Sequence, residues 1–397
     1  MSPATRDKFN FTSVESCALF LEGVRALNLY EEETGKHSPS LDTLKHTLDQ
    51  ALDKLGDCVR IYPDDRVAHF YYAIVLTLRN QEIYAGLLRD IKEALVAEGR
   101  FLNVLGMLRL YEAALDLSAQ KGPPVPDENG ESFRSEYKKQ KTASEPFSNL
   151  VNEQWPLLEE AAHEFEYVQS NGPDELKNTA AYNLAQVDGR RGSAKSLEHG
   201  LKVLDDIKLN TKPSIDERAL SLQIDILRYH LEARFQIDTK GEKSRFDRSW
   251  KALEGMPSAI SKESGLSSAY KIDLQADYLV KSGYVLYDQA LHDYFTDTPI
   301  DFLHAAADRF SKALFVRKSW NQAQLYLAVA LAIQSGVYPE FSKQSDQLFD
   351  SLLGTPEIKS TKTSLSEADS FLKAARELFQ AVQGKNVSAE AETQEEG

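Results

Sequence analysis

The sequence contains little of what marks extracellular or membrane proteins. It holds two cysteines, Cys17 and Cys58, in 397 residues, which is too few for a disulfide framework. It has no run of about 18 apolar residues, so we expect no membrane span. The first residues lack the apolar core of a signal peptide. These features lead us to expect a soluble protein of a reducing compartment, the cytoplasm.

Positive charge is also scarce. The chain carries 46 lysines and arginines against 61 aspartates and glutamates, which gives a formal net charge of −15. A surface of that sign repels the phosphate backbone of nucleic acids, so we expect no nucleic-acid partner. Lys138, Lys139 and Lys141 form a short basic run beside acidic residues. We interpret this run as a solvated loop.

Motifs of known catalysis are missing. The sequence has no glycine-rich phosphate loop, no dinucleotide-binding fingerprint and no GxSxG elbow. The segment Gly189–Lys195 contains glycines, but it lacks the spacing and the preceding strand of a phosphate loop, and we interpret it as a turn. We therefore predict no catalytic residue, no cofactor and no enzymatic activity. A catalytic pair built from distant residues leaves no local signature, so an enzyme with an unrecognised site stays one hypothesis.

No metal-binding pattern is evident either. The eight histidines are scattered, and no two of them lie three or four residues apart, so none can form a chelating pair on one helix. The nearest approach to a site is the group His292, Asp293, Asp297, Asp301 and His304. Thr298 stands where a calcium loop needs glycine, and aspartates beside Pro299 also serve as helix caps. We predict no metal site.

What the chain does contain is an internal repeat. The segment Ala51–Leu76 returns without a gap as Ala306–Leu331. The identical pairs are Ala51/Ala306, Asp53/Asp308, Ala68/Ala323, Tyr71/Tyr326, Ala73/Ala328 and Leu76/Leu331. Such a pair of segments indicates one supersecondary unit that is used more than once.

The repeated unit has the pattern of two helices joined by a turn. Ala51, Leu55 and Cys58 share one helical face, and Pro63 ends that helix. Small residues let helix axes approach closely, and large residues fill the gaps between them. A further copy spans Ala180–Leu204. Its first helix carries Leu184 and Ala185, and its second carries Leu197, Leu201 and Leu204.

This pattern resembles the tetratricopeptide repeat, a helix-turn-helix unit of about 34 residues. The matching positions are Ala51, Leu55, Cys58 and Pro63, followed by Tyr72, Ala73 and Leu76. Asp188 and Lys318 depart from the pattern, and the two long copies are not a whole number of periods apart. The resemblance implies an all-α fold, namely an α-solenoid of antiparallel helix pairs with degenerate repeats and insertions. The alternative is an irregular helical domain.

We predict four parts of the chain. Residues 1–120 hold N-terminal helical repeats, and 121–145 form a flexible linker or insertion rich in Pro, Gly and charge. Residues 146–384 hold C-terminal helical repeats with a capping helix, and 385–397 form a disordered acidic tail. The expected helices include Phe11–Tyr30, Arg66–Arg79, Glu82–Ala97, Phe101–Ala119, Trp155–Gln169, Ile215–Phe235, Phe246–Leu253, Ser267–Tyr294 and Leu365–Val382.

The resemblance also implies where a partner would bind, because the first helices of such repeats line a concave groove. The predicted partner-binding residues are Phe70, Tyr71, Ile74, Tyr182, Asn183, Gln186, Arg190, Leu325, Tyr326 and Val329. The family's clamp for a terminal carboxylate is echoed only by Asn183 and Arg190, and its lysines are absent. The alternative is that the chain's own helices cover this face.

Three functions fit these observations. The first is a non-catalytic scaffold or adaptor for protein–protein interaction, which binds a partner protein or peptide through the inner face of the solenoid. The second is a regulatory or sensor subunit that controls a separately encoded enzyme. The third is the enzyme with an unrecognised site. A stable stoichiometric partner would favour the first two.

Overall fold

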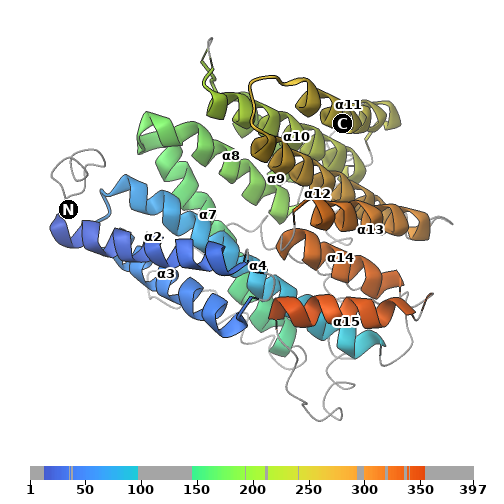
Figure 1. Cartoon of the computed structure of the whole chain (residues 1–397), viewed down its shortest axis with the longest axis horizontal. Coiled ribbons are helices and arrows are strands. Elements are labelled where there is room, and N and C mark those ends of the chain that lie inside the picture. The colour runs from blue at the N-terminus through green and yellow to red at the C-terminus, as the bar shows by residue number, and fades with distance from the viewer. Residues whose placement is uncertain are drawn as a thin grey trace, which may run out of the picture.

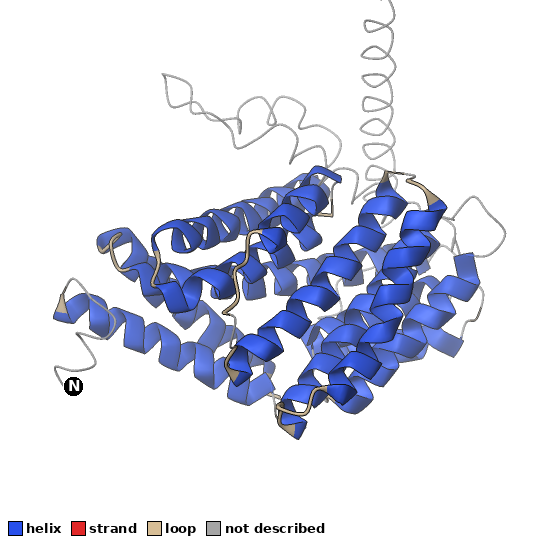
Figure 2. Cartoon of the chain, turned by 90° about the horizontal axis from the view of Figure 1, so that it is seen from above, coloured by secondary structure: helices blue, strands red, loops and turns tan. Residues whose placement is uncertain are grey.

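The protein is all-α in the part of the chain that the structure describes (Figures 1 and 2). The structure is a computed structural model, and it describes residues 13–34, 36, 39–96, 145–192, 194–210, 213–239, 241–292, 299–317, 321–334, 338 and 340–353. These residues form helices and turns and no strand, which confirms the predicted fold class. No described helix has the length and apolar character that crossing a bilayer requires.

The helices pack in chain order. They are α2 (Val14–Thr34), α3 (Leu41–Ile61), α4 (Arg66–Val96), α7 (Glu145–Asn171), α8 (Asp174–Arg191), α9 (Ala194–Asp205), α10 (Ile215–Asp238), α11 (Lys243–Lys262), α12 (Ser268–His292), α13 (Pro299–Val316), α14 (Asn321–Gln334) and α15 (Glu340–Leu353). Each of them contacts the next one described. Where short turns join neighbours, the neighbours run antiparallel, which is the arrangement of an α-solenoid.

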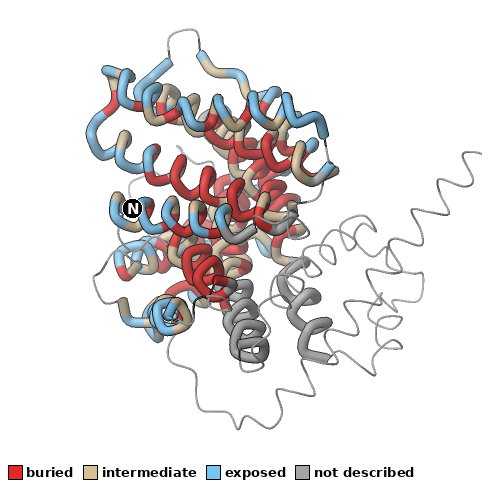
Figure 3. The backbone as a smooth tube through the Cα atoms, turned by 90° about the vertical axis from the view of Figure 1, so that its right-hand side faces the viewer, coloured by how far each residue is buried: buried red, intermediate tan, exposed pale blue. Residues whose placement is uncertain are grey.

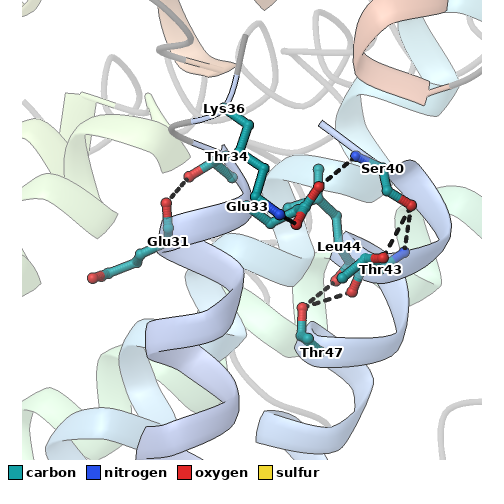
Figure 4. Close-up of polar contacts among 8 residues, drawn as sticks. All are labelled: Glu31, Glu33, Thr34, Lys36, Ser40, Thr43, Leu44 and Thr47. Atoms are coloured by element: carbon teal, nitrogen blue, oxygen red, sulfur yellow. Dashed lines mark hydrogen bonds and ion pairs between the residues drawn. The ribbon is translucent and has the colours of Figure 1, made fainter. Parts of the chain in front are cut away.

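Local capping explains several helix ends. The Ser40 side chain accepts a hydrogen bond from the Thr43 backbone N–H at 3.3 Å, as its position before α3 predicts. Glu33 at the end of α2 accepts from the Ser40 N–H at 2.7 Å and pairs with Lys36, so one carboxylate ties α2 to the start of α3 (Figure 4). Ser214 and Glu217 form a reciprocal capping box at the start of α10.

The internal repeat is a repeat in space. Its first copy forms α3 and the start of α4, and its second forms α13 and α14. Ten equivalent side chains are fully buried, with 0% exposed: Ala51/Ala306, Leu55/Phe310, Cys58/Ala313, Ala68/Ala323 and Ala73/Ala328. The same small and large positions therefore make the helix contacts near both ends of the described chain.

Helix α4 is longer than the sequence predicted. It runs without a break from Arg66 to Val96, whereas two helices, Arg66–Arg79 and Glu82–Ala97, were expected. Asn80 favours turns over helix interiors, but here it is buried, so packing overrides its weak propensity. The continuous helix reaches three hydrophobic clusters. It gives Val67, Ala68 and Val75 to the cluster of α2 and α3, Phe70, Ala73 and Leu76 to that of α7–α10, and Ala85 to that of α10–α15.

Two other boundaries were wrong. Helix α11 continues through Pro257 to Lys262, although we expected it to end before the proline. Leu253, Met256 and Ile260 are buried on both sides of Pro257, and that burial holds the helix together across one missing hydrogen bond. Helix α7 begins at Glu145 and not at Trp155, so Pro156 lies inside the helix and not in its first turn.

Some predicted elements lie outside the described residues. They are the helix Phe101–Ala119, residues 121–144 of the predicted linker, the helix Leu365–Val382 and the tail 385–397. The four-part division of the chain therefore stays a prediction.

Alternate helices form a ring. Helix α4 contacts α8, α8 contacts α10, α10 contacts α12, α12 contacts α14, and α14 returns to α4. Helix α15 also contacts α4, and Figure 1 shows it beside α4 at the lower edge of the molecule. Buried residues are concentrated in the middle of the helical stack (Figure 3). The inner side of the solenoid is thus closed by the chain itself.

The contact between α4 and α7 combines apolar and ionic groups. Phe70 and Phe165 pack edge to face with centroids 5.9 Å apart, and the Tyr72 hydroxyl donates to Glu160 at 2.8 Å. His69 forms a buried ion pair with Glu164, and its second ring nitrogen donates to the Pro63 carbonyl at 2.9 Å. Burial lowers the pKa of His69, but the hydrogen bond and charge of Glu164 outweigh it, so the net pKa is raised.

We predict that Phe310→Ala destabilises the fold strongly, while Phe315→Ala on the same helix does not. Phe310 is 0% exposed and stacks on Tyr326 with centroids 5.6 Å apart, whereas Phe315 is 86% exposed. The first change should lower the free energy of unfolding by about 3–5 kcal/mol. The second should change it by less than about 0.5 kcal/mol. Urea denaturation followed by circular dichroism checks both, and equal midpoints would contradict the assignment of Phe310 to the core.

We also predict a pH dependence that belongs to His69. A histidine whose pKa is raised on folding adds stability that is complete below its unfolded pKa of about 6.5 and is lost as pH rises through the folded pKa. The wild-type free energy of unfolding should therefore fall more steeply above about pH 6.5 than that of His69→Gln. His163→Gln, an exposed histidine on α7, serves as the control and should keep the wild-type slope. Parallel profiles for the wild type and His69→Gln would refute this role.

Candidate functional site

Five of the ten predicted binding residues are buried. Phe70, Tyr182, Leu325, Tyr326 and Val329 have between 2% and 9% of their surface exposed. The other five, Tyr71, Ile74, Asn183, Gln186 and Arg190, are half-buried. The alternative that the chain covers this face with its own helices therefore holds for the buried five. A role in partner binding stays a prediction for all ten.

Tyr326 shows why the apolar part of this face is covered. Its ring packs edge-on against Tyr284 with centroids 4.7 Å apart, and it stacks on Phe310 at 5.6 Å. Tyr284 comes from α12 and Phe310 from α13, so three helices meet at one ring. Because the inner helices contact one another, this part of the predicted groove surface is buried in the core.

The structure does bring Gln186, Arg190 and Tyr326 together. They line a cavity of about 40 Å³ inside the ring of inner helices. Its other lining residues are Gly189 from α8, Leu227, His230 and Arg234 from α10, Val280, Lys281 and Tyr284 from α12, and Gln322 from α14. Asn183 and the predicted residues of α4 do not line it.

Three permanent cations, Arg190, Arg234 and Lys281, line this cavity, and carboxylates balance two of them. The Arg234 Nε donates to Asp288 Oδ2 at 2.6 Å, with both side chains buried. A second nitrogen of Arg234 donates to the Gly189 carbonyl, and the guanidinium lies 4.4 Å from the centre of the Tyr284 ring. Lys281 pairs with Asp277 one turn earlier on α12. Arg234 and Lys281 are thus each neutralised by a carboxylate of this chain.

Arg190 differs from them. Its Nη1 donates to the Thr77 carbonyl of α4 at 3.0 Å. Among the described residues, no carboxylate lies within ion-pair distance of it, and no carboxylate lines the cavity. Burial lowers the pKa of Arg190, and the Tyr326 and Tyr284 hydroxyls only partly offset that effect. Since arginine does not lose its proton in proteins, the described cavity carries one positive charge without a partner.

His230 adds a neutral polar group. Its Nδ1 donates to the Lys281 carbonyl at 3.0 Å, which fixes the tautomer. Burial lowers the pKa of His230 well below its usual value, and the charges of Arg234 and Lys281 act in the same direction. The imidazole is therefore uncharged at neutral pH.

A second ionic cluster on α8 is structural. Asp188 is fully buried, pairs with Arg191 at 3.1 Å and accepts from His199 Nδ1 at 2.8 Å. Arg191 also reaches Glu159 of α7 at 3.0 Å. Asp188 stands where the repeat pattern expects a large residue, and these contacts explain how the helix pair accepts a carboxylate there.

No metal or nucleophile site stands out in the described ranges. They contain no group of three or more His, Cys, Asp and Glu side chains arranged around a common point. Asp293 and Asp297, two members of the His/Asp group named in the sequence analysis, lie outside those ranges, so the absence of a metal site stays a prediction. Both cysteines are buried, and burial raises the pKa of Cys58 to about 11, which keeps its sulfur a thiol.

Of the basic residues that line this cavity, only Arg190 was predicted from the sequence; His230, Arg234 and Lys281 were not. His230 and Arg234 are four residues apart, and Lys281 and Tyr284 are three apart, so each pair shares a helical face. That spacing was readable, but it gives no sign that two faces more than 40 residues apart converge. Only the path of the whole superhelix places them together.

Comparisons with known proteins identify no family. No family model matches the chain, and no curated protein matches it. Among solved structures, the crystal structure of yeast Tom70 is similar over 98% of this chain and 99% of its own, at 13% sequence identity and a TM-score of 0.19. That TM-score is too low to support an argument about fold or function.

Proposed function

We propose that the chain is a non-catalytic helical-repeat scaffold of the tetratricopeptide type, which holds a partner protein or peptide in the cytoplasm. The observation that carries this proposal is the duplicated hairpin, whose equivalent small and large positions are buried in both copies. In a chain built from such units, residues either pack against the neighbouring repeat or lie on an extended surface. Such a fold is better suited to binding a partner than to catalysis.

The proposed contact surface lies where α4 meets α8. The Arg190–Thr77 hydrogen bond joins these helices, and the half-buried Tyr71, Ile74, Asn183 and Gln186 lie on the same two helices. Gln186 donates to Asn183 at 3.1 Å, so the two amides form one polar unit. Apolar groups on α4 beside amides on α8 suit a partner segment that carries both kinds of side chain.

A regulatory or sensor subunit is the second candidate. One observation favours it: the cation-lined cavity is contacted by four of the five helices of the inner ring. A ligand held there would touch both the middle and the last repeat. Such a ligand could bias the packing of helices that a partner contacts.

We predict that Asn183→Arg weakens partner binding and leaves the fold intact. The full chain should retain one stoichiometric partner from an extract of the organism that encodes it. A bulky cation at a central position should raise the Kd at least about tenfold, since central contacts carry about 2 kcal/mol or more. Binding is measured by calorimetry with the purified partner, and the unfolding midpoint is measured alongside it.

Asn171→Arg provides the matched control. Asn171 is exposed at the end of α7, outside the proposed surface, and the substitution adds the same charge and bulk. Its Kd should equal that of the wild type. The proposal fails if the chain retains no stoichiometric partner, or if Asn183→Arg and Asn171→Arg bind it equally well.

A further inference from the structure

The cavity at the centre of the helix ring has an unbalanced charge. Three permanent cations, Arg190, Arg234 and Lys281, line it. The carboxylates of Asp288 and Asp277 balance two of them, and in the described chain Arg190 has only the Thr77 carbonyl. A half-buried charge without a counter-ion has lost part of its hydration, and buried charges in proteins are normally paired. A negatively charged ligand would supply the missing partner.

The cavity also offers hydrogen-bond donors from several directions. A guanidinium has five N–H groups, and the Thr77 carbonyl takes one contact from Arg190. Gln186 on α8, Gln322 on α14, Tyr284 on α12 and Tyr326 on α14 line the same space. Gln186 donates one amide N–H to Asn183, and Tyr326 accepts from Gln322 and Tyr284, so each amide keeps a second N–H. The remaining N–H groups of Arg190 and Gln186 on α8 and of Gln322 on α14 match an acceptor whose oxygens point in more than two directions.

The size of the cavity narrows the choice of ligand. One water needs about 10–15 Å³, so the volume of about 40 Å³ holds a group of only a few heavy atoms. Pockets for drug-sized molecules are about 300–1,000 Å³. A cation is disfavoured because the lining supplies no carboxylate and already carries positive charge. The remaining class is a small anion with several acceptor oxygens.

We propose that this cavity binds a tetrahedral oxyanion of the phosphate class, free or carried on a small molecule, and that Arg190 is its principal ligand. The oxyanion completes the ion pairing of Arg190 and accepts from the amides of Gln186 and Gln322 beside it. It bridges α8, α10, α12 and α14, and so it links the middle repeat to the last one. Binding to the purified chain needs no partner protein, so this site and the proposed scaffold function can fail separately.

Calorimetry and thermal denaturation of the full chain test the site. In a phosphate-free buffer, sodium phosphate should give a saturable heat and a rise in Tm, and sodium chloride at equal ionic strength should give neither. Arg190→Gln should weaken phosphate binding at least tenfold. Arg309→Gln, which removes a partly buried arginine that pairs with Glu254 at 3.0 Å outside the cavity, should bind phosphate as the wild type does.

The same variants give a second, independent readout. Without phosphate, Arg190→Gln removes a charge that has no carboxylate partner, so its Tm should equal or exceed that of the wild type. At saturating phosphate the order should reverse. If Arg190→Gln does not fold, Gln322→Leu, which removes one donor from the same cavity, should weaken binding instead.

Three probes define the ligand. If glycerol phosphate binds as tightly as inorganic phosphate, the site recognises a phosphoryl group on a carrier molecule. If only inorganic phosphate binds, the ligand is the free ion. Acetate that binds as tightly as phosphate would overturn the tetrahedral assignment. A phosphate response that equals that of chloride, or that persists unchanged in Arg190→Gln or its replacement, would overturn the site itself.

Discussion

Helix α4 is the element on which the packing of the other helices depends. It contributes side chains to all three hydrophobic clusters, from Val67 near its start to Ala85 two-thirds of the way along. A helix of 31 residues is about 46 Å long at 1.5 Å per residue, so one end packs on α2 and α3 while the other meets α14 and α15. If the helix broke near Asn80, the first cluster would be separated from the last. The contacts of α4 with α14 and α15, which close the ring, would then be lost.

Close approach of the helices makes this arrangement possible. Ala73 and Ala328 occupy equivalent positions in the two copies of the repeat, and both are fully buried. Glycines do the same work elsewhere: a Cβ on Gly23 would lie 2.5 Å from Leu55 Cγ, and one on Gly283 would lie 2.7 Å from Phe310 Cε1. Leu55 and Phe310 are equivalent large residues of the repeat, so each copy seats its large residue against a glycine of a neighbouring helix. The pattern of small and large residues is therefore a packing rule that both copies obey.

Features that depend on contacts within a few residues could be predicted from the sequence. Features that depend on contacts between distant helices of the ring could not. The Ser40 cap and the repeat positions were predictable, because a cap or a helical face depends on neighbours three or four residues away. The continuity of α11 through Pro257 was not, since buried residues on both sides decide it. The cavity falls between these cases. Arg190 and Tyr326 were selected by their positions on first helices, but His230, Arg234 and Lys281 join them only because α14 returns to α4. A groove would have left the aromatic face open, and closure made it core.

The positive cavity stands out in a chain whose formal net charge is −15. Acidic groups on the outside act through water and salt, and at physiological ionic strength their field decays over about 8 Å. Arg190, Arg234 and Lys281 act inside the ring, where hydroxyls and amides replace bulk water and the field of a charge is less screened. The two environments can therefore have opposite preferences within one molecule. The net negative charge disfavours large polyanions at the exterior, while the interior favours the small anion that we propose. Ligand size contributes to the selection, because the cavity volume of about 40 Å³ admits only a small group beside Arg190.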